Sequence, residues 1–260
     1  MENNILLKIG KFESAREYWL DKLSGNIEEV VLPKDLTGTS ERLMKEFNVL
    51  IENELSKKVI NICINHDLSL YAYTLSALKV LLHIYSGQED IIVGAPIYTI
   101  SDMSYNRYIL IRDSIENDSD FKSFLMSVSQ TITNGYKNQH YPIDKILGLL
   151  NMENERTLFK CMMAFENIHN IEDVWEKINL KECDICFLLV KVENKLELCI
   201  IYNSSLYKDS TIKSIAKNYS DVLSIVSENP EIKIKDVILP NDLLIVKNSF
   251  FDTEDDDFEF

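Results

Sequence analysis

The sequence predicts a mixed α/β fold in which helices cover a sheet. Apolar residues recur at helical spacing between Leu68 and Tyr85, and an uninterrupted β-branched run over 91–93 follows Gly87. A left-handed glycine commonly ends a helix, and such an apolar run is typical of a strand covered on both faces. Further helical and strand patterns interleave along the rest of the chain. A buried helix leading into a buried strand indicates layered α/β packing.

The segments around this central pair have their own periodicities. After an unassigned lead-in over 1–12, residues 14–25 repeat as a helix with Trp19 inward. Residues 43–52 alternate as a half-buried strand, and 55–63 repeat as a helix. For the central helix, either Asp67 or Ser69 is expected to cap the start. The later elements are a strand over 107–115, a helix capped by Ser119 or Asp120, a short helix beginning near Pro142, a strand over 159–165, a hairpin about Glu193 and Asn194, and a helix capped by Asp209.

Composition bounds the class of protein. The chain has 260 residues, 46% of them hydrophobic, and a formal net charge of −15. The acidity and the lack of a basic cluster argue against nucleic acid and against anionic membrane surfaces as partners. We find no secretion signal and expect no membrane-spanning run, and the five cysteines favour a reduced, cytoplasmic protein. We expect one folded domain over 1–245 and an acidic tail over 246–260.

Two His-x-x-x-Asp pairs are the candidate catalytic groups. They are His140 with Asp144 and His169 with Asp173. A histidine of this kind can act as general base in acyl transfer. Pro142 interrupts the first pair, and no glycine follows the second to permit a tight active-site turn. Both histidines therefore keep a structural interpretation beside the catalytic one.

The Cys183-x-x-Cys186 pair is the one arrangement that suggests a metal. A single pair without a second is weak evidence for zinc, and in a strand this spacing points the two thiols to opposite faces. We therefore expect two core cysteines, no metal site and no bound cofactor.

Several stretches, taken in order, resemble the condensation domain of non-ribosomal peptide synthetases. AREYWLDKLSG resembles a helix that opens the second half of that domain, and LLHIYSGQEDIIVGAPI is similar to the family's LLHRYTGQEDIVVGTPV. NQHYPIDKIL resembles the H-Q-D-Y-P-F-E-K-L motif, and RTLFKCMMAFEN the L-F-x-x-x-x-x-F-E-N motif. CDICFLLV and LELCIIYNSSLY resemble the closing hairpin, and FFDTEDDDF the linker toward an adenylation domain. The resemblance covers nearly the whole chain.

Two family features differ in this sequence. The catalytic signature His-His-x-x-x-Asp-Gly belongs to the first half of the domain and does not occur here. The G-F-V-N-T segment reads MSYNRYILIRDSI, in which Asn106 is retained. The resemblance therefore implies a single chloramphenicol-acetyltransferase-like lobe, an α+β sandwich with a mixed sheet covered by helices. We expect a stand-alone C-terminal half of a condensation domain.

The resemblance also implies roles and partners. The chain would contribute substrate-tunnel and carrier-binding surface for amide bond formation, with catalysis by a separate N-terminal lobe. Expected partners are that lobe or other synthetase modules and peptidyl carrier proteins, which carry the phosphopantetheine. The residues matched to the family motif are Asn138, Gln139, Tyr141 and Asp144, on the substrate or carrier side, while Asp184 would brace a strand end.

Two alternatives remain open at this stage. One is a self-contained, homo-oligomeric acyltransferase that uses His169 or His140 as its base. The other is a non-catalytic scaffold or the remnant of a split synthetase.

Overall fold

A six-stranded mixed sheet organises the protein. The computed structural model describes residues 2–28, 30, 32–37, 43–98, 106–116, 118–152, 158–170 and 183–239, with side chains from Gly10 onward. The strand order is β1-β6-β5-β4-β2-β3, with β2–β4 and β4–β5 parallel and the other pairs antiparallel. The strands are β1 (Met44–Leu50), β2 (Asp90–Pro96), β3 (Tyr108–Ser114), β4 (Cys161–Phe165), β5 (Ile185–Val192) and β6 (Lys195–Asn203). The expected acidic tail and Asp173 lie outside the described residues.

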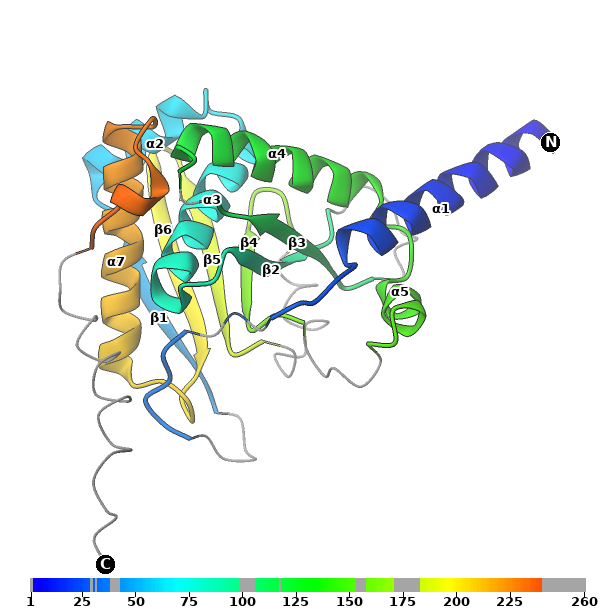
Figure 1. Ribbon diagram of the computed structural model, residues 1–260. Helices are drawn as coiled ribbons and strands as arrows, with labels where there is room; N and C mark the ends of the chain where they lie inside the picture. Colours follow the sequence, from blue (N-terminus) through cyan, green and yellow to red (C-terminus); the bar gives the residue numbers. More distant parts are fainter. Residues whose placement is uncertain are drawn as a thin grey trace, which may run out of the picture.

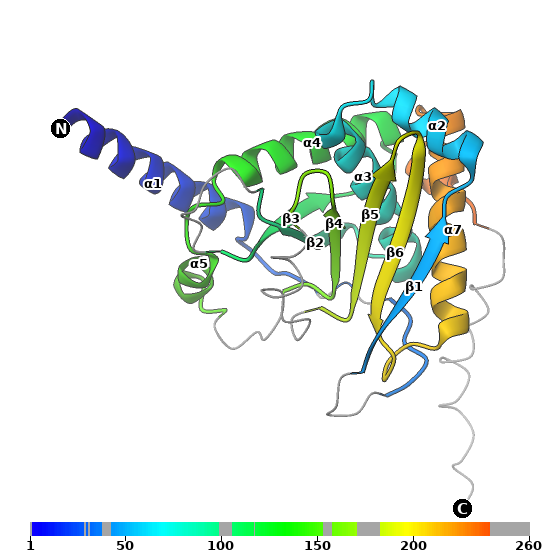
Figure 2. The ribbon, with the colours of Figure 1, turned by 180° about the vertical axis from the view of Figure 1, so that it is seen from behind.

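The long helices lie against the sheet. In Figure 2 the strands β4, β5, β6 and β1 stand in front of α3 and α7, whereas Figure 1 shows these two helices from the other side. The N-terminal part of α1 extends away from the sheet (Figure 1). The helices are α1 (Glu2–Lys22), α2 (Asn53–Ile62), α3 (Asp67–Ser86), α4 (Phe121–Lys137), α5 (Ile143–Leu149) and α7 (Asp209–Glu228), followed by the short 3₁₀ helix η1 (Ile234–Asp236). The α/β class and the mixed sheet covered by helices are confirmed.

Helix α3 is the core of the fold, as its sequence predicts. Most of its side chains are buried, and Gly87 ends it in the left-handed conformation, with φ of 71°. Its start differs from the expectation: His66, and neither Asp67 nor Ser69, is the N-cap, and its Nδ1 accepts from the Ser69 N–H. The expectation of no membrane-spanning run was also wrong by length and composition, because α3 satisfies both. Its burial inside the fold is that of a core helix.

Several strand and helix limits also differ from the sequence expectation. Helix α1 begins at Glu2, so it includes most of the lead-in over 1–12, for which the sequence predicts no element. Strand β2 continues through Gly94, where a side chain would collide with the ring of Phe159. Strand β4 begins at Cys161, two residues later than expected, and it lies inside the sheet, buried on both faces. Asp209 is the first helical residue of α7, not its cap; its carboxylate accepts from Tyr202 Oη at 2.9 Å.

Candidate functional site

The 138–147 motif comprises the loop between α4 and α5 and the first residues of α5, and its first residue is held by two helices. The Trp19 indole Nε1 of α1 donates to the carbonyl of Asn138 at 2.9 Å. The Asn138 side-chain amide donates to the carbonyl of Asn134, one turn back in α4, at 2.9 Å. The loop therefore leaves α4 in a fixed direction.

Gln139 attaches this loop to the end of β2. The Tyr98 N–H donates to Gln139 Oε1 at 2.8 Å, and Gln139 Nε2 donates to the Tyr98 carbonyl at 2.9 Å. The side-chain amide of Gln139 thus bonds to both the N–H and the C=O of Tyr98, as the backbone of a neighbouring strand would. Both residues are half-buried, so water competes only partly for these bonds.

Asn106 holds the same loop from the start of the β3 segment. Its Nδ2 donates to the carbonyls of Gln139 and Tyr141, at 2.6 and 2.7 Å, and its Oδ1 accepts from the Ile143 N–H at 2.9 Å. Pro142 precedes α5 and offers no side-chain cap, so an asparagine distant in sequence accepts from the first helical N–H instead. We call Tyr98, Asn106, Gln139 and Tyr141 the clamp, because the first two residues are joined to the motif through the last two.

The remaining motif residues differ in their surroundings. The Tyr141 ring is buried and lies 4.6 Å from the Phe12 ring of α1, measured between centroids. Asp144 is exposed in the first turn of α5, where the helix dipole favours a carboxylate. His140 is half-buried, with its ring 6.3 Å from Phe12. Among the described contacts, none joins His140 to Asp144, so the structure does not bring this pair together.

His169, the second candidate base, lies in the core. Its Nδ1 accepts from the Phe165 N–H at 2.9 Å, so the neutral ring carries its proton on Nε2, which lies 2.7 Å from Tyr136 Oη. The Tyr71 ring packs edge-on against the His169 ring, and the Tyr71 hydroxyl donates to the Met163 carbonyl at 3.0 Å. Burial lowers the pKa of His169 to about 3. Both nitrogens are occupied and 3% of the residue is exposed, which is the environment of a structural histidine.

The other candidate residues also have structural surroundings. Asp184 is buried at the start of β5, and its carboxylate lies 3.0 Å from Lys34 Nζ, joining the sheet to the segment after α1. Cys183 and Cys186 are both buried, and burial raises the pKa of Cys186 well above its ordinary value. Within the described ranges, no group of three or more His, Cys, Asp or Glu side chains could hold a metal ion.

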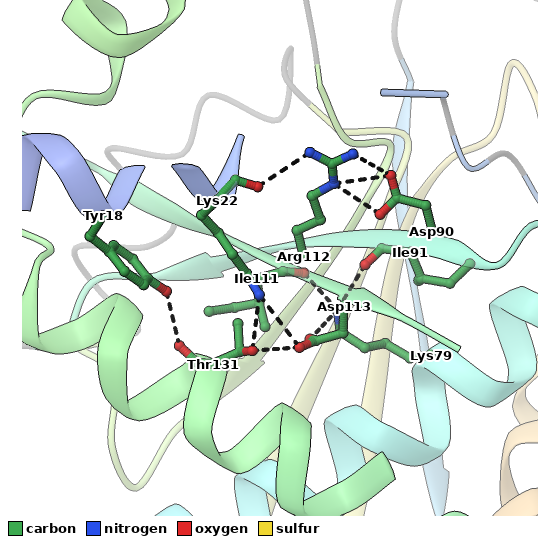
Figure 3. Close-up of polar contacts among 9 residues, drawn as sticks. All are labelled: Tyr18, Lys22, Lys79, Asp90, Ile91, Ile111, Arg112, Asp113 and Thr131. Atoms are coloured by element: carbon green, nitrogen blue, oxygen red, sulfur yellow. Dashed lines mark hydrogen bonds and ion pairs between the residues drawn. The ribbon is translucent and has the colours of Figure 1, made fainter. Parts of the chain in front are cut away.

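A buried ion pair that the sequence did not predict is shown in Figure 3. Lys79 of α3 and Asp113 of β3 lie 2.9 Å apart, with 0% and 1% of their side chains exposed. Lys79 Nζ also donates to the carbonyls of Ile91 and Ile111, and Thr131 Oγ1 of α4 donates to Asp113 Oδ1 at 2.5 Å. The pair therefore joins β2, β3, α3 and α4 around one point.

A half-buried neighbour of this pair, Arg112, anchors the end of α1. Arg112 forms a two-point ion pair with Asp90 and donates to the carbonyls of Lys22, Ser24 and Asn26. The end of α1 is thus fixed by Arg112, which donates to the Lys22 carbonyl (Figure 3), and by Trp19, which donates to the Asn138 carbonyl next to the clamp.

Replacing Asn106 by alanine is expected to lower the free energy of unfolding by about 1.5–3 kcal/mol, since three hydrogen bonds in a half-buried site are lost. The loosening should be greatest at the Tyr98 and Ile143 amides, whose hydrogen exchange should accelerate. Asn106→Asp is the matched control, because it keeps the acceptor for Ile143 and removes both donors. Equal protection of the Ile143 amide in wild type and Asn106→Ala would contradict the clamp.

Comparison with known proteins agrees with this architecture. Gramicidin S synthase 2 of Brevibacillus brevis is 26% identical over 256 residues, which are 90% of this chain and 6% of the synthase. Surfactin synthase subunit 2 of Bacillus subtilis (strain 168) is 24% identical over 250 residues, 88% of this chain and 7% of that protein. The chain thus spans less than a tenth of the length of these relatives.

Solved structures share the fold at low identity. The X-domain from teicoplanin biosynthesis superposes with a TM-score of 0.72 at 18% identity, covering 88% of this chain and 57% of that one. The starter condensation domain of rhizomide synthetase gives 0.69 at 14% identity, covering 92% and 58%. The fold is therefore that of condensation domains, which is chloramphenicol-acetyltransferase-like. The condensation-domain profile matches residues 5–243, and the chain belongs to the condensation-domain family.

Proposed function

We propose that the chain provides the C-terminal lobe of a condensation domain, which works with a lobe carrying the catalytic histidine on another polypeptide segment. The supporting observation is coverage: about nine tenths of this chain corresponds to 57–58% of two solved domains of this fold. The matched part of the chain thus covers somewhat more than half of such a domain. In this proposal it forms one wall of a substrate tunnel and offers surface to carrier proteins.

The environment of the histidines supports a non-catalytic role for this lobe. His169 has both ring nitrogens engaged in the core and a pKa lowered to about 3, so it is poorly suited to accept a proton from a substrate amine. His140 is half-buried beside α1, with Asp144 outside its hydrogen-bonding contacts in the described structure. A base supplied by a partner lobe fits these positions better than either histidine.

The reaction in this proposal is amide bond formation between two carrier-bound groups. A histidine of the partner lobe accepts the proton of the acceptor amine, which attacks the thioester carbonyl of the donor. The carbon–sulfur bond breaks, and the phosphopantetheine thiol of the donor carrier leaves with a proton. The clamp would contribute by fixing the motif loop at the wall of the tunnel.

Mixing experiments with loaded carriers test this division of labour. We expect no product from this chain alone, and product when a lobe that contains His-His-x-x-x-Asp-Gly is added. Alanine at the second histidine of that signature should abolish product, whereas His140→Ala in this chain should leave the rate within about twofold, since it touches no reacting group. Mass spectrometry of the acceptor carrier measures the product.

Two results would contradict the proposal. Product from this chain alone that disappears in His140→Ala or His169→Ala would establish the self-contained acyltransferase. If the chain binds neither the added lobe nor either carrier, and no mixture forms product, the scaffold or remnant interpretation replaces the proposal.

A further inference from the structure

The sheet has two edge strands, and they differ in what lies beside them. At β3, Arg112 holds the end of α1 and the residues after it by donating to three of their carbonyls. At β1, the described hydrogen bonds join the strand to β6 on one side only. β1 pairs with β6 in one continuous register over seven residues and contains no proline or glycine. Such an edge readily pairs with another strand.

The outer groups of β1 can be assigned from its two ends. The Ser204 N–H donates to the Leu43 carbonyl at 2.7 Å, and the Ile51 N–H donates to the Leu196 carbonyl at 3.0 Å. In an antiparallel ladder, alternate residues bond to the neighbouring strand, so the odd-numbered residues of β1 face β6. The N–H and C=O groups of the even-numbered residues therefore point away from the sheet. These residues are Met44, Glu46, Asn48 and Leu50.

We propose that β1 pairs antiparallel with β1 of a second copy of this chain, about a two-fold axis at Phe47. The strand is self-complementary in this register. Met44 faces Leu50 of the second copy, which pairs two apolar side chains on the outer face of the sheet. Glu46 faces Asn48, which pairs an acceptor with a donor, and the two Phe47 rings face each other. All seven residues pair, and the outer backbone groups of both strands are satisfied.

Other registers fit less well. A shift of one residue turns the outward N–H and C=O groups of the two strands away from each other, so the nearest alternative registers are shifted by two residues. A shift in one direction places Glu46 against Glu46 of the second copy, and the opposite shift places Glu46 against Leu50. Each shift also leaves end residues unpaired. The sequence of β1 thus favours the symmetric register.

Charge gives the interface a characteristic dependence on salt. Lys45 is engaged by Asp209 at 3.1 Å, so Glu46 is the remaining charged side chain of the strand. The whole chain carries a net charge of −15, which opposes association of two copies. Added salt screens this long-range repulsion and leaves backbone hydrogen bonds and apolar contacts in place. The dimer should therefore be stronger at high salt than at low salt.

The proposed interface is independent of the function proposed above. Strand β1 lies at the opposite end of the strand order from β3, whereas α1 and α5 lie near β3 (Figure 1). A second copy at β1 would leave the clamp accessible. Association can therefore be measured without carriers or a partner lobe.

Sedimentation of the chain over a range of concentrations tests the pairing. We expect wild type to shift from monomer to dimer, more readily at high salt. Asn48→Glu places a carboxylate opposite Glu46 of the other copy at each of the two symmetric contacts. This variant should weaken the dimer about tenfold. Adding Glu46→Lys to that variant converts both contacts into opposite-charge pairs and should restore the dimer. Ser127→Glu, at an exposed position of α4, is the control with the same net charge as Asn48→Glu and should dimerise as wild type.

Three outcomes would overturn the proposal. One is a chain that stays monomeric at every concentration and salt level. Another is a dimer that Asn48→Glu and Ser127→Glu weaken equally. The third is a dimer that forms only after residues 246–260 are removed, which would assign the β1 edge to the tail of the same chain. Circular dichroism of each variant verifies that the fold is retained.

Discussion

Replacing Asp113 by alanine is expected to lower the free energy of unfolding by about 3–5 kcal/mol, because it leaves the Lys79 ammonium in the core without its counter-ion. Neither side chain reaches solvent, and burial already lowers the pKa of Lys79, with the Asp113 carboxylate acting in the opposite direction. Without the carboxylate, Lys79 must lose its proton or the surrounding core must open. Thr131 also loses its acceptor. Urea unfolding at pH 7 measures the change.

The matched control removes both charges. A Lys79→Met, Asp113→Leu double variant should be much closer to wild type than Asp113→Ala, since apolar replacement of a buried ion pair is often neutral or stabilising. A surface ion pair gives a second comparison. Lys57→Ala removes an exposed contact to Glu54 and should lower the free energy of unfolding by less than about 1 kcal/mol. An Asp113→Ala cost as small as that of Lys57→Ala would show that Lys79 does not depend on Asp113.

Local signals in the sequence predicted much of the fold, because their physical causes are local. Asp120 caps α4 as expected, with Oδ1 accepting from the Ser123 N–H at 2.8 Å. Gly87 ends α3 in the conformation that favours glycine. The hairpin turns at Glu193, which has φ of 54°. In each case the residues that determine the geometry lie within a few positions of one another.

Two of the errors concern residues whose partners come from another helix or strand. A lysine inside an apolar helix suggests a solvated position, yet Lys79 is buried because Asp113 comes from another element. Asp209 looked like a helix cap, but Tyr202 and Lys45 bind its carboxylate. Periodicity carries no information about such pairings, since any apolar stripe tolerates a polar residue only when tertiary contacts satisfy it.

The candidate site shows the same difference between what local sequence signals predict and what contacts between separate elements determine. The motif residues Gln139 and Tyr141 could be found from the family resemblance, but their function in the clamp depends on Tyr98 and Asn106, which come from other parts of the chain. Likewise, His169 was a reasonable candidate base in sequence. Its burial against Tyr71 and Tyr136 follows from the packing of α3 and α4, which the His-x-x-x-Asp spacing does not encode.

Acidification is expected to destabilise the fold through His169. The pKa of His169 is about 3 in the folded protein, whereas a histidine in the unfolded chain titrates near 6.5. Between these values the unfolded state binds a proton that the folded state excludes, so stability falls as pH falls. The loss is about 1.4 kcal/mol for each pH unit below roughly 6.5, or about 2 kcal/mol at pH 5. Above pH 6.5 both states are neutral and this contribution is constant.

The neighbours of His169 do not offset this loss. Tyr71 and Tyr136 face the ring, and burial raises the pKa of both phenols above the ordinary tyrosine value, so neither phenol ionises to stabilise an imidazolium.

Other groups contribute to acid sensitivity, and a difference measurement separates them. His169→Gln can keep one acceptor for the Phe165 N–H and one donor for Tyr136 without titrating. Its stability should decline by about 2 kcal/mol less than that of wild type between pH 7 and 5. Parallel curves for wild type and His169→Gln would show that His169 gains its proton without opening the core.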